Sequence, residues 1–217
     1  MSAVSRVAAV TPESRAFMIS AFIGGIPTVR TEAIAVPPGL GEDERVLYAV
    51  RRFNKGDSKY LLVSGLNMGE RTAKAFDIKT LSSTPFNLSR FVGVHTQIHA
   101  DNTPDQATWI MSKVRELGIQ SLAISAPPYH LPRAYLTVLA AFRKAGISAS
   151  DCMLIPFPTP MSPYYHVPEA EVMAVEMIPA EYERIMRYMQ KGDVANMGEL
   201  LEYIDSLICV MNARGLI

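Results

Sequence analysis

The sequence predicts an α/β fold of the Rossmann-like type: a three-layer sandwich with a mostly parallel central sheet of about five strands and extra C-terminal helices. Short apolar runs of strand length alternate with segments of helical period along the chain. The runs are continuously apolar, as expected for parallel strands covered on both faces. At 217 residues, of which 49% are hydrophobic and 19% charged, the chain is long enough to bury one sizeable core.

The five expected strands are the apolar runs 33–36, 60–64, 91–95, 121–125 and 152–157. Helical periodicity predicts helices over 41–53, 67–76, 103–117, 131–145, 180–190 and 197–211. Thr103 is the expected N-cap of the third helix, because Pro104 would then occupy its first position and Gln106 would complete a T-x-x-Q capping box. Asn196 and Glu199 are expected to cap the last helix in the same way. Residues 33–217 therefore form one domain, whose helical C-terminal part begins at about residue 169.

Residues 1–32 are expected to form an N-terminal arm that packs on the domain or on a partner subunit, so a homo-oligomer is compatible with the sequence. Its apolar patch, 16–26, is shorter than the roughly 20 residues of a membrane span and ends in helix breakers. The expectation is a cytoplasmic protein with no stable membrane span. Cys152 and Cys209 have no metal-like spacing, and both are expected to be buried free thiols.

The balance of 21 basic and 21 acidic residues argues against broad nucleic-acid binding but leaves room for a local basic pocket. Such a pocket is expected where Pro127, Pro128 and Pro132 delay the start of the fifth helix to about Leu131. His130 and Arg133 then lie at the mouth of that helix. Cations are disfavoured beside a helix N-terminus, so two of them there indicate a bound anion.

Parallel sheets bind ligands beyond the carboxyl ends of their strands, where several polar residues of this chain should converge. Arg133 is expected to clamp a phosphate or carboxylate, or else to form a surface salt bridge. His130 is expected to act as a general acid or base, or only to cap its helix. The remaining candidates are Glu70 for a ribose hydroxyl or the helix dipole, Asn102 and Thr103 for backbone N–H groups at a capped helix, and Ser64, Gly65 and Ser125 for ligand contacts.

Neither serine has the G-x-S-x-G spacing of a hydrolase nucleophile. His95 and His99 fall in a strand-to-loop segment where their spacing does not place them on one face, so no metal site is expected.

Several short motifs resemble the SanA/YdcF family, catalogued as domain of unknown function 218. They are NTPDQA at 102–107, YHLPRA at 129–134, LLVSG at 61–65 and EYERIMRYMQKGDVA at 181–195. Together with Arg45 to Ala49 in the first helix and with Glu70, they extend the resemblance over about residues 33–195. The family usually has a Gly-rich turn after its first strand. Here Val36 is followed by Pro37, Pro38 and Gly39, which removes two N–H donors from that turn.

The residues and the resemblance together imply a protein that binds an anionic nucleotide-type or phosphorylated small molecule. S-adenosylmethionine is one such nucleotide-type ligand. The catalytic form of the hypothesis is a transferase or hydrolase acting at a phosphoryl or carboxyl group, with Arg133 holding the anion, His130 exchanging a proton and Glu70 orienting the substrate. The alternatives are a ligand-binding protein without turnover and, from the family resemblance, a scaffold in cell-envelope biogenesis.

The loop 157–168, FPTPMSPYYHVP, is too rich in proline for a strand or helix and unusually aromatic for a solvated connection. It follows the fifth strand on the ligand side. It is therefore expected to form a wall or lid of the pocket, with Tyr164 or Tyr165 stacking on a flat ligand group and His166 supplying a polar contact. The alternative is that these rings pack on the C-terminal helices or on a second subunit.

Overall fold

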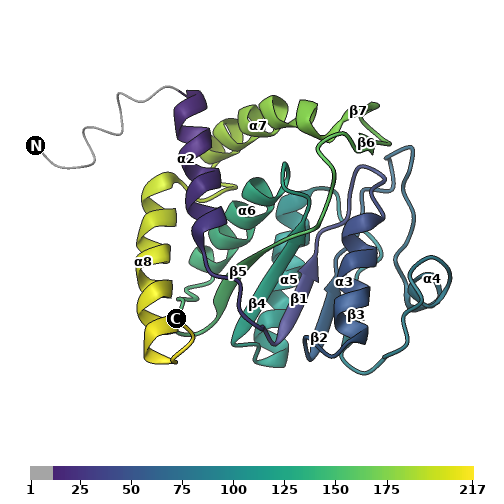
Figure 1. Ribbon diagram of the computed structural model, residues 1–217, viewed down its shortest axis with the longest axis horizontal. Helices are drawn as coiled ribbons and strands as arrows, with labels where there is room; N and C mark the ends of the chain where they lie inside the picture. The colour runs from purple at the N-terminus through teal and green to yellow at the C-terminus, as the bar shows by residue number, and fades with distance from the viewer. Residues whose placement is uncertain (1–11) are drawn as a thin grey trace, which may run out of the picture.

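The computed structural model describes residues 12–217, and its centre is a five-stranded parallel sheet with strand order β3-β2-β1-β4-β5 (Figure 1). This confirms the predicted α/β, Rossmann-like fold. The first two strands and the fourth begin where the sequence predicts, and the third begins three residues later than expected. The strands are β1 Ala33–Val36, β2 Tyr60–Val63, β3 Val94–Thr96, β4 Ser121–Ala126 and β5 Met153–Pro158.

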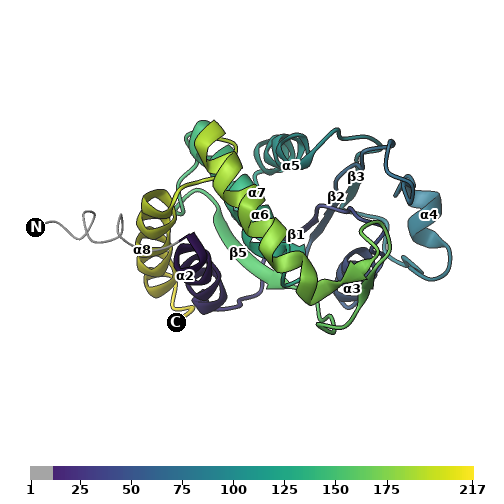
Figure 2. The same cartoon turned by 90° about the horizontal axis from the view of Figure 1, so that it is seen from above.

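Helices cover the sheet on both faces because alternate residues of its strands point to opposite sides. Helix α3, Glu44–Asn54, packs on Ile34 and Val36 of β1. Helices α5, Thr103–Leu117, and α6, Leu131–Lys144, pack on Ala33 and Ala35. Figure 2 shows α3 and α5 on opposite sides of the strands. The order reverses between β1 and β4, where the chain crosses from one side of β1 to the other.

The first turn of α5 differs from the prediction. Its N-cap is Asn102, whose side-chain oxygen accepts from the Asp105 N–H at 3.0 Å, and Thr103 is already the first helical residue. Gln106 takes no part in capping, because its amide donates to Pro38 O at 2.8 Å and Gly65 O at 2.7 Å. The T-x-x-Q box is therefore wrong, and Gln106 instead joins the ends of β1 and β2.

The helix expected over 67–76 is absent, and the segment is a series of turns before the short helix α4, Ile78–Ser82. The physical reason is that side-chain oxygens accept from backbone N–H groups of this segment. The N–H groups of Arg71 and Thr72 both donate to the Glu169 carboxylate at 2.9 Å, and Asn67 Oδ1 accepts from the Gly69 N–H at 2.8 Å. These bonds replace those of a helix.

The C-terminal part contains β6 His166–Val167, β7 Val172–Met173, the 3-10 turn η1 Ala174–Glu176, α7 Met177–Lys191 and α8 Met197–Ala213. The antiparallel pair β6–β7 corrects the expectation that 157–168 forms no strand. The predicted capping box of α8, Asn196 with Glu199, is confirmed. Helix α7 lies across the carboxyl end of the sheet above α6, as both ribbon views show.

The N-terminal arm contributes helix α2, Pro12–Gly25, which packs on α6 and α7 through Ile19 and Ile23. Within residues 12–217, no helix combines the length and the apolar character that crossing a membrane requires. Tyr203 of α8 covers the edge strand β5, because its hydroxyl accepts from the Leu154 N–H at 2.7 Å and donates to Cys152 O at 3.2 Å. Cys152 is buried as predicted, but Cys209 is exposed on the outer side of α8.

Candidate ligand-binding site

A small cavity of about 120 Å³ lies at the carboxyl end of the sheet, where the strand order reverses. This is the position at which open parallel sheets bind ligands. It brings together five of the eight candidate residues predicted from the sequence. The lining comprises Pro38, Gly39 and Leu40 after β1, Asn67 and Glu70 after β2, Ala100, Asp101, Asn102, Thr103 and Gln106 around the start of α5, and Arg45, His130 and Arg133.

One side of the cavity is formed by a buried pair at the start of α3. Arg45 donates to the Glu42 carboxylate and, at 2.8 Å, to Pro37 O. The Tyr129 hydroxyl donates to the other oxygen of Glu42. The Arg45 Nε–H has no acceptor among residues 12–217, although the side chain is buried. A buried N–H without a partner is costly, so this atom is a candidate donor to a ligand.

The opposite side is formed by a second buried pair that joins α6 to α7. Arg133 donates through Nε to Glu181 Oε2 at 2.6 Å, and its Nη2 lies 3.3 Å from Glu181 Oε1. Its Nη1 donates to the Thr103 hydroxyl at 2.8 Å. The clamp geometry that the sequence assigns to a ligand is thus occupied by Glu181. One N–H of Arg133 Nη1 has no acceptor among the described residues.

His130 occupies the N-cap position of α6, yet its side chain makes no capping bond. Its Nδ1 lies 3.1 Å from Glu181 Oε2 and 3.2 Å from Arg133 Nη2. Burial and the neighbouring Arg133 charge lower the pKa of His130 to about 4, so the ring is neutral at pH 7. Because a neutral ring carries one N–H, Nδ1 either donates to Glu181 or accepts from Arg133. Nε2 has no protein partner in the described part of the chain and remains for a ligand.

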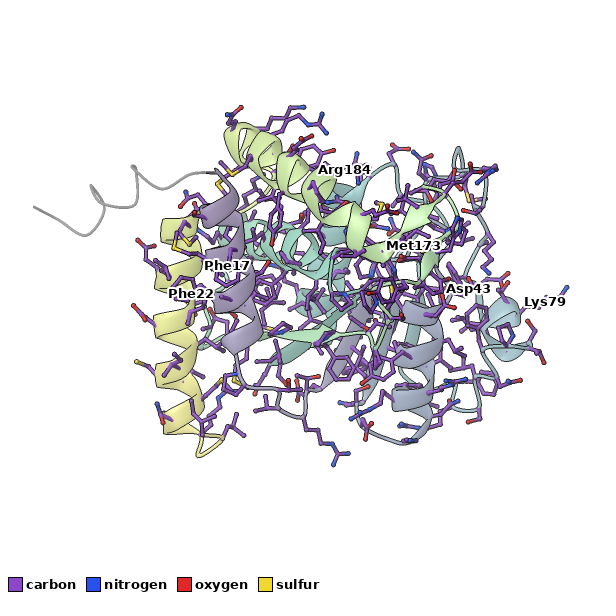
Figure 3. All side chains as sticks on the ribbon, turned by 45° about the horizontal axis from the view of Figure 1, so that its top comes forward. Phe17, Phe22, Asp43, Lys79, Met173 and Arg184 are labelled. Carbon is purple, nitrogen blue, oxygen red and sulfur yellow. The ribbon has the colours of Figure 1, made fainter. Side chains whose placement is uncertain are left out.

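The Glu181 carboxylate keeps its charge although it is buried. Burial alone would raise the pKa of Glu181, but the hydrogen bond with His130 and the charge and hydrogen bonds of Arg133 outweigh it and hold the pKa well below its usual range. Arg184, labelled on α7 in Figure 3, donates to the same carboxylate at 2.5 Å. Burial and the adjacent Glu42 raise the pKa of Tyr129, which keeps its hydroxyl a donor.

Glu70 ties two loops of the cavity wall together rather than opening a helix. Its Oε2 accepts from the Leu40 N–H at 3.0 Å. Leu40 itself has φ +55°, a left-handed conformation that is uncommon for a leucine and costs free energy in this turn. Burial raises the pKa of Glu70 above its usual value. The alternative role of Glu70, stabilising a helix dipole, is wrong because residues 67–76 do not form a helix.

Ser64, Gly65 and Ser125 lie behind the cavity and have internal partners. Ser64 Oγ donates to Val36 O at 3.3 Å, and Ser125 Oγ lies 3.2 Å from Thr159 Oγ1. A Cβ at Gly65 would stand 2.4 Å from the backbone carbon of His99, so glycine is needed there for close packing. These three residues support the lining, whereas Glu70, Asn102, Thr103, His130 and Arg133 form part of it.

Sequence reasoning assigned no role to Arg45 or Glu181, although the pattern carried a signal for both. Arg45 shares a helix face with Val46, Ala49 and Val50, and Glu181 lies midway between the buried Met177 and Ile185 at four-residue spacing. A charged residue on the core-facing side of a helix is rarely buried without a partner. Each position therefore indicated a buried ion pair.

The proline-rich loop forms the wall of a different cavity. Met161, Ser162 and Pro163 line an apolar hollow of about 270 Å³ together with Pro128, Tyr129, Ala174, Val175 and Ile178. The Tyr165 hydroxyl donates to Glu44 Oε2 at 2.7 Å, and Tyr164 and His166 are exposed. Tyr129 is the residue that connects this hollow with the buried pair at Glu42.

A scan against protein-family models finds no match to this chain, and a search of the curated proteins finds none either. Within residues 12–217, no three His, Cys, Asp or Glu side chains are grouped so that they could hold a metal ion. The groups that line the cavity are guanidinium groups, an imidazole, carboxylates and the N-terminus of α5.

Proposed function

We propose that the cavity binds the anionic group of a nucleotide-type or phosphorylated small molecule. The observation that carries this proposal is Arg45, whose side chain lines the cavity and whose buried Nε–H has no acceptor among the described residues. The N–H of Thr103 at the start of α5 and one N–H of Arg133 Nη1 also lack acceptors within residues 12–217. Free donors at a helix N-terminus favour an anion.

The charge around the cavity supports the same ligand class. Arg45, Arg133 and Arg184 provide three guanidinium groups, while Glu42 and Glu181 provide two carboxylates in contact with them. Glu70 and the exposed Asp101 also line the cavity, so their carboxylates offset part of this positive charge. Within the cluster of paired groups itself the guanidinium groups outnumber the carboxylates by one, and attraction for an anion is screened less there than at the surface.

The size of the cavity restricts what enters it. Pockets for drug-sized ligands measure roughly 300–1,000 Å³, so a cavity of about 120 Å³ holds a phosphoryl or carboxylate group rather than a whole nucleotide. We place the rest of the molecule at the mouth, where Asn67, Asp101 and Asn102 are exposed. Glu70 Oε1, which has no protein donor in the described chain, is positioned to accept from a sugar hydroxyl.

The test compares two arginines that bind the same carboxylate. Arg133 lines the cavity, whereas Arg184 contacts Glu181 from outside it. Isothermal titration calorimetry with inorganic phosphate and with AMP should show that Arg133→Lys weakens binding by about 1–3 kcal/mol, because lysine cannot keep the bonds to Glu181 and Thr103 and also offer the Nη1 N–H that lacks a protein acceptor. Arg184→Lys should change affinity by less than about twofold. Equal affinity of wild type and Arg133→Lys would contradict the proposal, as would no binding of either probe.

A catalytic version is favoured by the contact between His130 and Glu181. A carboxylate at Nδ1 orients the imidazole and leaves Nε2, which has no partner among the described residues, to exchange a proton with a bound group. Should the protein hydrolyse a generic phosphomonoester, His130→Gln is expected to lower kcat by about 10²–10⁴. Its affinity for inorganic phosphate should stay within a few-fold of wild type, which separates proton transfer from binding.

Native mass spectrometry of freshly purified protein would identify a co-purified nucleotide.

A further inference from the structure

A second hollow lies at the amino ends of the strands, at the opposite end of the sheet from the first cavity. It measures about 480 Å³ and is found where β1, β2 and β4 begin. Figure 1 shows this end of the sheet on the side away from α7. The two sites share no lining residue. Because β1 and β2 lie between them and rise about 3.3 Å per residue, the sites are more than about 10 Å apart.

Three cationic side chains line this hollow, and they come from three separate segments. Arg30 precedes β1, Lys59 precedes β2 and Arg90 precedes β3. None of the three forms a salt bridge with a described side chain of residues 12–217. The one carboxylate on the lining is Glu32, which accepts from the Gln120 N–H at 2.7 Å. Positive charge therefore exceeds negative charge on the lining.

The turn that ends α3 holds two of these guanidinium groups in place. Arg30 Nη2 donates to Gly56 O at 2.5 Å, and its Nε lies 3.4 Å from Asp57 O. Arg90 Nη1 donates to Phe53 O at 2.5 Å, and the guanidinium lies 4.6 Å from the centre of the Phe53 ring. A Cβ at Gly56 would stand 3.8 Å from Arg90 Nη1, so both arginines converge on this residue. The negative end of the α3 dipole favours cations here.

Capping of α3 uses only part of these two groups. Arg30 Nη1 and Arg90 Nε and Nη2 have no acceptor among the described residues. Ser58 also lines the hollow and is only 4% exposed, and its backbone N–H has no acceptor in the described chain. An N–H without a partner in a mostly buried residue is costly. The donors that remain match a ligand that is rich in acceptors and negatively charged.

We propose that this hollow is a second anion site, which binds a small molecule carrying at least two phosphoryl groups. A guanidinium can bind one phosphoryl group through paired hydrogen bonds, so Arg30 and Arg90 together match two such groups, with Lys59 adding charge. The volume lies within the roughly 300–1,000 Å³ of small-molecule pockets. A nucleic acid needs an extended basic surface, which is not expected of a chain with a net charge of +0. The site is independent of the first cavity, so either can bind without the other.

Nuclear magnetic resonance titration with inorganic pyrophosphate, in a buffer free of phosphate, reads the two sites separately. The amide signals of Gly56 and Lys59 report the second site, and those of Leu40 and Thr103 report the first cavity. The Gly56 and Lys59 signals should shift and saturate in wild type. The same shifts should remain in Arg133→Lys, which alters the first cavity alone. Inorganic phosphate should bind the second site at least about tenfold more weakly than pyrophosphate, because it occupies one guanidinium instead of two.

Variants of the lining arginines test which groups bind. Arg30→Gln and Arg90→Gln should each weaken the pyrophosphate affinity measured at Gly56 by at least about tenfold, because each removes one charged donor. Arg51→Gln is the matched control: Arg51 is exposed on α3 outside the lining, and its variant should stay within about twofold of wild type. Arg90 also stacks on Phe53, so melting temperatures are measured alongside. Arg30 is exposed, and its variant decides the test if Arg90→Gln fails to fold.

Three outcomes would overturn the proposal. One is the absence of saturable shifts at Gly56 and Lys59 up to about 10 mM pyrophosphate. Another is an unchanged affinity at these signals in Arg30→Gln, or equal affinities for phosphate and pyrophosphate in wild type. The third is tighter binding of a single-stranded oligonucleotide, with shifts that spread along α3 to Arg51 and Lys55, which would make this end of the sheet a nucleic-acid surface.

Discussion

Two buried arginine–glutamate pairs flank the same cavity, and they are built in different ways. Glu42 and Arg45 are three residues apart and meet when the turn before α3 forms. Arg133 and Glu181 are 48 residues apart and meet only when α7 lies across the sheet. The local pair leaves Arg45 Nε without an acceptor in the described chain, whereas every nitrogen of Arg133 has a partner.

This difference separates two tasks of buried charge. The long-range pair satisfies its guanidinium almost completely and fixes α7 over the carboxyl end of the sheet, so it acts mainly on structure. The local pair is held by a short turn that cannot satisfy all of Arg45, and the donor that remains is available to a ligand. Arg133, the expected ligand clamp, therefore contributes more to stability, and Arg45, to which sequence reasoning assigned no role, presents the freer donor.

The largest expected effect concerns the long-range pair. Glu181→Ala should lower the free energy of unfolding by about 3–5 kcal/mol, because it leaves Arg133 buried without its counter-charge. Urea denaturation of the purified variant measures this. Glu183→Ala, an exposed position on the same helix, should change stability by less than about 0.5 kcal/mol. If the two variants are equally stable, α7 is not held by this pair.

A double substitution sharpens that result. Arg133→Met with Glu181→Leu removes both charges and keeps apolar volume, so it should recover part of the stability that Glu181→Ala loses. A double variant that is as unstable as the sum of its single variants would show that the two side chains act independently.

The second prediction is a pH dependence that originates in the long-range pair. His130 has a pKa of about 4 in the folded protein against 6.5 for an ordinary histidine. As the pH falls below 6.5 the unfolded chain takes up a proton that the folded chain refuses, so stability decreases down to about pH 4 and is then unaffected by this group. The loss is on the order of 3 kcal/mol.

His130→Asn should flatten the stability curve between pH 6.5 and pH 4, measured by urea denaturation at each pH. Glu181 acts at lower pH, because its folded pKa lies below the usual range; its stabilising contribution is lost as the pH falls through that value. His166→Asn, at an exposed ring, should leave the curve of the wild type unchanged. An unchanged curve for His130→Asn would show that the ring already titrates normally when folded.

The comparison also explains which parts of the fold the sequence predicts. The strands at 33–36, 60–63 and 121–126 are confirmed because continuous apolar runs encode buried parallel strands locally. The start of α6 at Leu131 is confirmed because prolines exclude an earlier one. The helix expected at 67–76 fails because the acceptor of the Thr72 N–H is Glu169, 97 residues away. No local pattern contains that partner.

The candidate site also has a part that the sequence predicts and a part that depends on tertiary contacts. Topology alone brings Glu70, Asn102, Thr103, His130 and Arg133 to one cavity, because each follows the carboxyl end of a strand or begins the next helix. The partners of those residues depend on tertiary contacts. Glu181, which occupies the clamp of Arg133, lies on a helix whose position over the sheet is decided by packing, and the charge of the cavity depends on that contact.

The smallest expected effect distinguishes the neighbours Asn102 and Thr103. Asn102 makes a local contact within its own helix, whereas Thr103 contacts Arg133 of the long-range pair. Asn102 is a local N-cap, so Asn102→Ala should cost ~1 kcal/mol of stability whether or not α7 is docked. Thr103 accepts from Arg133, so Thr103→Val should cost about 0.5–1.5 kcal/mol by leaving that guanidinium one acceptor short.

In double-mutant cycles with Glu181→Ala, Asn102→Ala should be additive, whereas Thr103→Val should show a coupling of at least about 0.5 kcal/mol. Because the two residues are adjacent and both begin α5, their difference isolates the contact with Arg133 from general effects on the helix. Coupling of equal size at both positions would mean that α5 and α7 communicate through the helix as a whole and not through the threonine hydroxyl.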